Sequence, residues 1–115
     1  MEDDVRQRVI IKFTRKYSET AHQACFKLGI APKLYKVVNV GYGWNLVIMD
    51  YLENYLTLDK LECDEFLATQ SLVTRAMNEF HDLGFVHGDL RPPNILYRDG
   101  DVKIIDFDWA GKAEG

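Results

Sequence analysis

The 115-residue sequence lacks the features that would place it in several specialised classes of protein. It has only two cysteines, Cys25 and Cys63, which are too few for a disulfide scaffold and do not form a CxxC pair. We therefore expect two reduced thiols, as in a cytosolic or nuclear protein. No apolar run approaches the roughly 20 residues that span a membrane. The acidic start, Met1 to Asp4, is followed by no apolar stretch, so no signal or transit peptide is expected.

An excess of positive charge is also missing. The 14 Lys and Arg residues are outnumbered by 18 Asp and Glu, which gives a formal net charge of −4. This balance argues against a nucleic-acid partner, because phosphate contacts usually need a basic face. The content of 47% apolar and 12% aromatic residues argues against disorder. We expect one modest globular domain, or half of a larger one, that is intracellular and cytoplasmic and has no membrane partner.

The first half of the chain is predicted to be rich in strands. Residues 8–13 are mostly β-branched or aromatic and predict a strand. Alternation divides its side chains between two faces: Val9, Ile11 and Phe13 on one, and Ile10 and Lys12 on the other. Ser18 is a good N-cap for a helix that ends near Leu28. Two further strands are expected over residues 33–40 and 44–51, joined by a glycine-containing hairpin turn.

The second half is predicted to contain one long helix and a small hairpin. Residues 52–58 form a connector, and a helix runs from Asp64, its cap, to Leu83. The helix carries an apolar stripe that is made of Phe66, Val73, Met77 and Phe80, flanked by Leu72, Ala76 and Leu83. Short strands over residues 95–97 and 102–105 enclose an Asp-Gly turn, which is a strong hairpin signal. The tail, residues 111–115, has no packing signal.

Polar side chains that can carry chemistry gather in two places. In the segment 87–94, Asp89 and Asn94 flank a Pro-Pro bend that stiffens the loop. The second cluster, Asp106-Phe107-Asp108, directly follows a strand. The intervening hairpin brings Asp106 toward the loop, so three oxygen-bearing side chains can surround one point. Carboxylate and amide oxygens are the ligands that Mg²⁺ prefers.

The pattern His87-x-Asp89-x-x-x-x-Asn94, followed by Asp106-Phe107, resembles the catalytic loop and metal-binding motif of the protein kinase superfamily. The tripeptide His-Gly-Asp, in place of His-Arg-Asp, is more similar to the motif of atypical and small-molecule kinases, such as aminoglycoside and choline phosphotransferases. It also resembles fungal kinase-like sequences.

The resemblance implies a partial α+β fold of the protein-kinase type. Residues 1–52 match most of the small lobe and end at the hinge, and residues 53–115 match the start of the large lobe. There is no room for the Gly-rich loop strands or for the helices of the large lobe. We therefore expect a truncated kinase core, in which the long helix stays exposed unless a partner chain covers it.

The resemblance also assigns roles in the catalytic loop and the metal-binding motif. Asp89 would accept or orient the substrate hydroxyl, and Arg91 would act near the transferred phosphate. His87 would support the loop. Asn94 and Asp106 would hold Mg²⁺ on the triphosphate of ATP.

Further roles fall in the first half of the chain. Lys12 resembles the strand lysine that holds the α- and β-phosphates, and Glu19 is the candidate carboxylate partner of this lysine. Met49, Asp50 and Leu52 resemble the gatekeeper and hinge. There the carbonyl of Asp50 and the N–H of Leu52 would bond the adenine edge.

Two positions depart from the family pattern. Gly88 stands where many kinases carry the Arg that reads a phosphorylated activation loop, so a switch of that kind is not expected. Asp108 replaces the Gly of Asp-Phe-Gly, which removes a flexible position.

The implied function is ATP- and Mg²⁺-dependent transfer of the γ-phosphate to a protein Ser/Thr or a small-molecule hydroxyl. An inert kinase-like fragment or pseudokinase, acting as a nucleotide-binding or protein-interaction module, is the alternative. A metal-dependent hydrolase built on the Asp/His cluster ranks last, because it explains neither the lysine strand nor the hinge.

Overall fold

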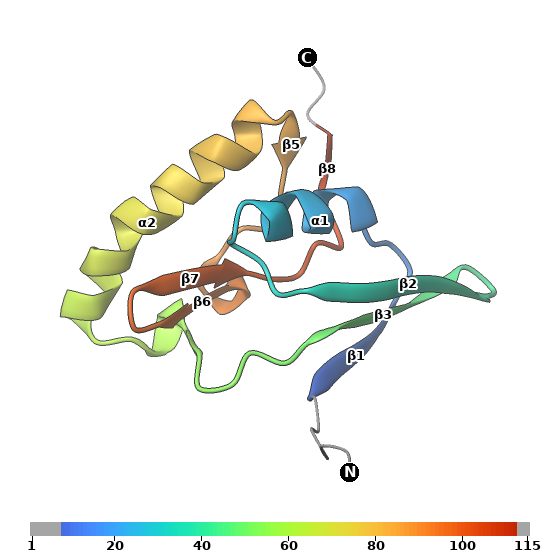
Figure 1. Ribbon diagram of the computed structural model, residues 1–115, viewed down its shortest axis with the longest axis horizontal. Coiled ribbons are helices and arrows are strands. Elements are labelled where there is room, and N and C mark those ends of the chain that lie inside the picture. Colours follow the sequence, from blue (N-terminus) through green and yellow to red (C-terminus); the bar gives the residue numbers. More distant parts are fainter. Residues whose placement is uncertain (1–7, 113–115) are drawn as a thin grey trace, which may run out of the picture.

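The computed structural model describes residues 8–112, in which a sheet and a helix are followed by a long helix and two small sheets (Figure 1). The helices and strands are, in chain order, β1 Val9–Thr14, α1 Glu19–Lys27, β2 Leu34–Gly41, β3 Trp44–Asp50, β4 Leu56–Thr57, α2 Cys63–Asp82, β5 Phe85–Val86, β6 Ile95–Arg98, β7 Asp101–Ile104 and β8 Gly111–Lys112. Two short 3₁₀ helices, η1 Leu58–Lys60 and η2 Pro92–Asn94, lie in the connections.

The first sheet is antiparallel and has the order β1-β3-β2. The turn between β2 and β3 places Tyr42 at φ 57° and Gly43 at φ 80°, as the predicted tight hairpin requires. In β1, Lys12 lies opposite the fully buried Val47, so its side chain shares the inner face of the sheet. The two predicted faces of β1 are therefore confirmed, but Val9, Ile11 and Phe13, which make up its apolar face, are exposed to solvent.

Helix α1 has the predicted beginning and end. The Ser18 hydroxyl accepts a hydrogen bond from the N–H of Ala21 at 3.2 Å, which satisfies one of the free donors of the first turn. The helix closes at Leu28, and Gly29 then takes φ 79°, a left-handed conformation that glycine adopts without steric cost. The inner face of α1 is fully buried and contains the free thiol of Cys25.

His22 is the polar exception on that buried face. Its Nε2 lies 2.8 Å from the carbonyl oxygen of Pro32, so Nε2 carries the proton and donates it. Its Nδ1 therefore accepts from the hydroxyl of Tyr17 at 2.6 Å. Both ring nitrogens are thus satisfied in the neutral form. Burial disfavours the charged form and lowers the pKa of His22, although the Pro32 carbonyl favours the charged form.

The C-terminal half of α2 packs in the main core. Ala76, Met77 and Phe80 are buried, and the ring of Phe80 stacks on that of Phe85 with 5.5 Å between centroids. The expectation that the whole apolar stripe would find little to bury it is therefore wrong for this half. Phe66, near the start of the helix, is exposed.

The start of α2 differs slightly from the prediction. Glu62 is the N-cap, and Asp64 lies in the first turn instead of capping the helix. A carboxylate in the first turn still interacts favourably with the helix dipole. Cys63, the second free cysteine, is exposed.

The hairpin of β6 and β7 forms as predicted, with Asp99 at φ 46° and Gly100 at φ 85° in its turn. Nearby, the structure adds two short strands that the sequence did not predict. The connector 52–58 contributes β4, which pairs with β6, and the tail contributes β8, which pairs with β5. Both short strands form through backbone hydrogen bonds, which need no side-chain pattern in the sequence. The acidic start of the chain and residues 113–115 lie outside the described residues.

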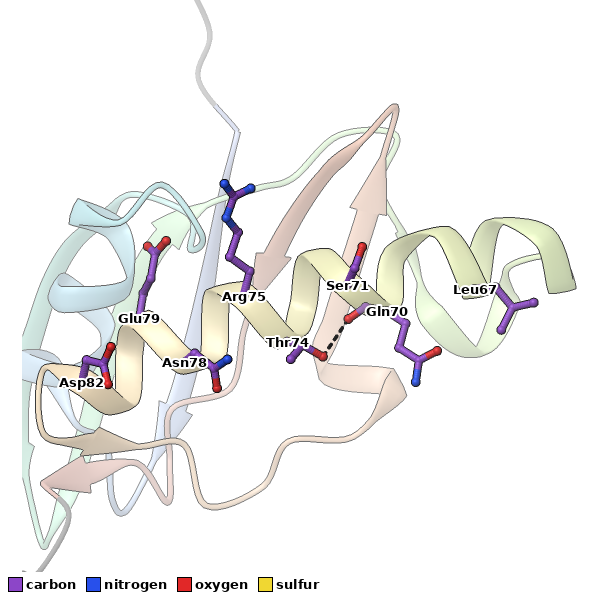
Figure 2. A pocket seen from close by; sticks show the side chains of 8 residues that line it. All are labelled: Leu67, Gln70, Ser71, Thr74, Arg75, Asn78, Glu79 and Asp82. Carbon is purple, nitrogen blue, oxygen red and sulfur yellow. Dashed lines mark hydrogen bonds between the residues drawn. The ribbon is translucent and has the colours of Figure 1, made fainter.

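The outer face of α2 carries an open hollow (Figure 2). It is lined by Leu67, Gln70, Ser71, Thr74, Arg75, Asn78, Glu79 and Asp82. All of these except Leu67 are polar or charged, so the hollow differs from the apolar stripe predicted for this helix. None of the helices within residues 8–112 has the length and apolar character needed to cross a membrane.

Burial of His22 predicts that stability depends on pH. Its pKa in the fold lies below the ordinary value of 6.5, so below that pH the unfolded chain binds a proton that the folded chain does not. The free energy of unfolding should therefore fall as the pH drops below 6.5, by up to about 1.4 kcal/mol per pH unit from this group. Urea denaturation over a pH series measures this slope.

His22→Gln should flatten that slope. His81→Gln, which removes an exposed histidine of α2, should leave it as it is in the unaltered chain. Equal slopes in the His22 variant and the unaltered chain would contradict the assignment.

Candidate functional site

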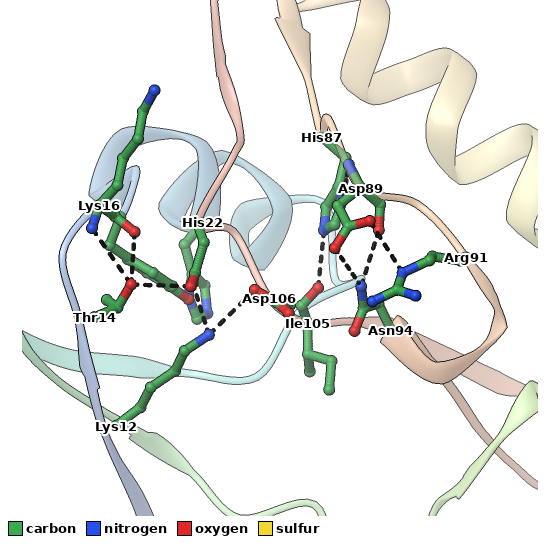
Figure 3. A network of polar contacts seen from close by, with 12 residues as sticks. Lys12, Thr14, Lys16, His22, His87, Asp89, Arg91, Asn94, Ile105 and Asp106 are labelled. Carbon is green, nitrogen blue, oxygen red and sulfur yellow. Dashed lines mark hydrogen bonds and ion pairs between the residues drawn. The ribbon is translucent and has the colours of Figure 1, made fainter.

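Lys12 is the centre of a polar network between β1 and the segment that follows β7 (Figure 3). Its Nζ lies 2.6 Å from Oδ1 of Asp108 and 3.1 Å from Oδ1 of Asp106. The other carboxylate oxygen of Asp108 lies 2.9 Å from the hydroxyl of Thr14, which follows on the same face of β1. The ring of Tyr17 approaches from another side, with its centroid 5.7 Å from Nζ. The lysine is thus held by two carboxylates and one aromatic face.

Partial burial and the charges of this network have opposite effects on the pKa of Asp106. Burial favours the neutral form of Asp106, but the hydrogen bond and the charge of Lys12, helped by bonds to Asp108, outweigh it and hold the pKa of Asp106 below its usual value. Burial, and then the charges of Asp108 and Asp106, raises the pKa of Tyr17. The network therefore favours the ionised form of Asp106 and the neutral phenol of Tyr17.

His87 anchors the loop that carries the second part of the site. Its side chain is buried, and its Nε2 donates a hydrogen bond to the carbonyl of Ile105 at 2.8 Å. Its Nδ1 accepts from the backbone N–H of Asp89 at 3.2 Å. One imidazole thus connects the strand end before Asp106 with the backbone of Asp89.

Both carboxylate oxygens of Asp89 are engaged within the loop. The side-chain amide of Asn94 lies 3.3 Å from one of them and also donates to the Asp89 carbonyl at 2.9 Å. Nε of Arg91 lies 3.0 Å from the other oxygen, and its side chain is 63% exposed. The Asn94 contact is part-buried, whereas the Arg91 contact lies at the surface and is the easier one to exchange.

Two connections hold these halves of the site together. The N–H of Ile105 donates to the carbonyl of Asn94 at 3.0 Å. The ring of Phe107 is fully buried, and its centroid lies 4.7 Å from that of His22 and 5.1 Å from that of His87. A row of three rings therefore runs from α1 to the catalytic-type loop.

The structure does not pair Lys12 with Glu19, so that expectation is wrong. Glu19 is exposed in the first turn of α1, and no ion pair joins it to Lys12 in the described part of the chain. The short connection 15–18 leaves α1 starting beside Phe107, whose carbonyl accepts from the N–H of Ser18 at 3.1 Å. Asp108 takes the place of the expected partner. The sequence signal that could have predicted this partner of Lys12 was the second carboxylate, two residues after Asp106.

The hinge-like residues lie at the end of β3. Met49 is buried, and the N–H of Asp50 donates to the carbonyl of Lys33 at 2.9 Å. The Asp50 carboxylate accepts from the hydroxyl of Tyr35 at 2.6 Å. The adenine contacts of Met49, Asp50 and Leu52 remain predictions.

The protein kinase domain family matches residues 6–115. The chain belongs to this family. It is 37% identical over 82 residues to KEOPS complex subunit Bud32 of Pyrococcus abyssi, across 64% of this chain and 37% of that protein. It is 38% identical over 96 residues to the mitosis inhibitor protein kinase mik1 of Schizosaccharomyces pombe, across 73% of this chain and 16% of that one.

The solved structure of the Cydia pomonella granulovirus kinase PK-1 shares the fold, with a TM-score of 0.72 at 20% identity. The match covers 95% of this chain and 47% of the viral one. The predicted α+β fold, a partial protein-kinase fold, is thereby confirmed. The chain spans less than half the length of each of these three proteins.

The oxygen atoms of this site suit a hard cation but supply only part of its coordination. Within residues 8–112, no three or more His, Cys, Asp or Glu side chains are grouped as a metal site. The amide oxygen of Asn94 and the carboxylate of Asp106 are the candidate ligands. Mg²⁺ is commonly bound by one or two carboxylates and completes its shell with phosphate and water. These donors therefore fit a cation that arrives with a phosphate-bearing ligand.

Gly88 is explained by packing. It has φ 86°, and a Cβ at this position would lie 2.5 Å from the carbonyl oxygen of Trp109. The loop can approach the segment after Asp108 this closely because the residue has no side chain. The sequence showed the departure from the family at Gly88 but not its steric cause.

Gly88→Ala should therefore destabilise the fold by about 3 kcal/mol or more, which combines the left-handed conformation with a backbone clash. Gly100→Ala is the matched control, because Gly100 has φ 85° with nothing within 4 Å of an added Cβ. The control should cost only about 1–2 kcal/mol. Denaturant midpoints measure both losses, and equal losses would rule out the clash with Trp109.

Proposed function

We propose that this chain is the nucleotide-binding and catalytic-loop part of an ATP- and Mg²⁺-dependent phosphotransferase. It would transfer the γ-phosphate to a hydroxyl of a protein Ser/Thr or of a small molecule, inside the cell. The observation that carries the proposal is the Ile105–Asn94 hydrogen bond, 3.0 Å long, which ties the loop of Asp89 to the strand end that presents Asp106 to Lys12. The matching kinase domain family supports the general chemistry.

Charge neutralisation and alignment are what phosphoryl transfer needs most from a protein. Lys12 would supply a compact positive charge to the phosphates, and Mg²⁺, when bound, would neutralise further charge on the triphosphate. Asn94 and Asp106 would hold that ion. Residues 1–52 and 53–115 would contribute the lysine and the loop, as small-lobe and large-lobe parts.

Asp89 would orient the acceptor hydroxyl and take its proton. One of its carboxylate oxygens must first lose its present partner. The contact with Arg91 would be given up most easily, because that guanidinium is 63% exposed. Asn94 would keep the other oxygen in place, and the released Arg91 would be free to approach the transferred phosphate.

A kinase-like module without turnover is the second candidate. It is favoured by the partners that Lys12 and Asp89 already have within the chain. A partner chain that covers the outer face of α2 would suit this role. The metal-dependent hydrolase alternative gains no support from the structure, because residues 8–112 contain no group of three or more His, Cys, Asp or Glu side chains that could hold a metal ion.

Thermal unfolding of the purified chain tests nucleotide binding. Mg-ATP at about 100 times its dissociation constant should stabilise the fold by about 2.7 kcal/mol, which raises the Tm by several degrees in a domain of this size. ATP with a chelator should raise it less. A cooperative transition that ignores Mg-ATP would contradict nucleotide binding and favour the interaction module.

Asp89→Asn tests turnover. It should leave the Mg-ATP-dependent rise in Tm in place while lowering phosphoryl transfer by about 10²–10⁴-fold, because the general base is lost. Transfer is measured as the radiolabel that passes from the γ-phosphate of ATP into each of a panel of hydroxyl acceptors. Asp59→Asn, which alters an exposed residue of η1, is the control and should keep full activity. Undiminished transfer by the Asp89 variant would exclude this residue as the base.

A further inference from the structure

Asp108 is a charged residue of the network that the family pattern leaves without a role. Its carboxylate oxygen lies 2.6 Å from Nζ of Lys12, whereas the nearest oxygen of Asp106 lies 3.1 Å from the same atom. Both carboxylates are partly shielded from solvent, with exposed side-chain fractions of 24% for Asp108 and 30% for Asp106. The shorter contact is thus made by the residue that stands where a glycine is expected.

The two carboxylates also differ in how they are held. The second oxygen of Asp108 lies 2.9 Å from the hydroxyl of Thr14. The N–H of Lys16 donates to that same hydroxyl at 3.3 Å, and Nζ of Lys16 lies 5.2 Å from the centre of the Trp109 ring. Both carboxylate oxygens of Asp108 are therefore bonded by side chains of β1, one by Lys12 and the other by Thr14. Asp106 is bonded within this network by Lys12 and by Asp108.

An ammonium group has three N–H donors, and two of them are directed at Asp108 and Asp106. If Asp106 turns to a cation, one carboxylate must remain to keep the long lysine side chain in place. Glu19 is exposed on α1 and makes no ion pair with Lys12 among the described residues. The hydroxyl of Thr14 holds Asp108 beside the lysine at 2.9 Å and also lies 3.0 Å from the carbonyl oxygen of Lys16.

We infer that Asp108 is the positioning residue of Lys12: it takes over the task of the helix carboxylate and holds the ammonium group toward the nucleotide phosphates. This inference rests on the proposed function, since it assigns a phosphate-binding role to Lys12. Asp106 is then the exchangeable partner of the lysine and Asp108 the permanent one. Thr14 assists by orienting the carboxylate of Asp108.

The test compares the affinities of the full chain for Mg-ATP and for adenosine, which has no phosphates for Lys12 to contact. Asp108→Asn should weaken Mg-ATP binding by about tenfold, or about 1.4 kcal/mol, and leave adenosine binding unchanged. Asp108→Glu, which keeps the carboxylate, should restore at least part of the loss. Isothermal titration calorimetry measures each dissociation constant.

Two further variants show whether the effect passes through Lys12. In a Lys12→Met background, Asp108→Asn should change Mg-ATP affinity by less than about twofold, because the coupled group is already gone. Asp101→Asn is the matched control, since Asp101 also bonds a lysine, Lys103, at 2.7 Å but lies outside the network. This control should bind Mg-ATP as the unaltered chain does.

Several results would overturn the inference. These are unchanged Mg-ATP affinity in Asp108→Asn, a loss that persists in the Lys12→Met background, and a loss seen with Mg-ATP but not with ATP and a chelator. The last result would make Asp108 a metal ligand. A loss of Mg-ATP affinity in Glu19→Gln instead would show that Glu19 of α1, and not Asp108, positions Lys12.

Failure of the proposed function is distinguishable from failure of this inference. If the unaltered chain binds no Mg-ATP, the proposed function is wrong, and the Lys12–Asp108 pair is judged from denaturant midpoints of the two single variants and the double variant. A double variant that loses clearly less than the sum of the single losses would support the pairing. Additive losses would overturn it.

Discussion

The burial of one aromatic ring, that of Phe107, is the constraint on which the site depends. The ring lies between His22 of α1 and His87 of the loop, and no part of the residue is exposed. Because Phe107 stands between Asp106 and Asp108, packing its ring sets the position of both carboxylates. Its carbonyl also receives the N–H of Ser18, so the start of α1 is placed by the same residue.

The burial of Phe107 also depends on the neutral form of His22. The ring can stack on Phe107 in the core because Tyr17 and Pro32 satisfy its two nitrogens without a charge. A polar side chain therefore completes an apolar core, and the cost of burying it is offset by its hydrogen bonds. The same Tyr17 turns its ring toward Lys12, so the core and the charged network share a residue.

The charged network also contains Asp108, which stands where the family pattern has a glycine and contacts Lys12 at 2.6 Å. A lysine in a partly buried position needs a carboxylate partner, and the short connection 15–18 leaves Glu19 at the exposed start of α1. The partner comes instead from the segment that already supplies Asp106. This arrangement joins Lys12, Asp106 and the loop of Asp89 within a chain that spans less than half of its relatives' length.

Local signals in the sequence were enough to predict much of the fold. Ser18 and Gly29 bound α1, and the tight turns at Tyr42-Gly43 and Asp99-Gly100 form the two expected hairpins, because caps and turns depend on residues close together in the chain. The spacing of His87, Asp89, Asn94 and Asp106 was sufficient to identify the protein kinase family, since that motif is itself local. Only the tertiary structure decided which carboxylate reaches Lys12, which face of β1 turns inward, and why Gly88 must lack a side chain. Each of these depends on contacts between segments far apart in the chain, and neither residue spacing nor composition encodes the distances between them.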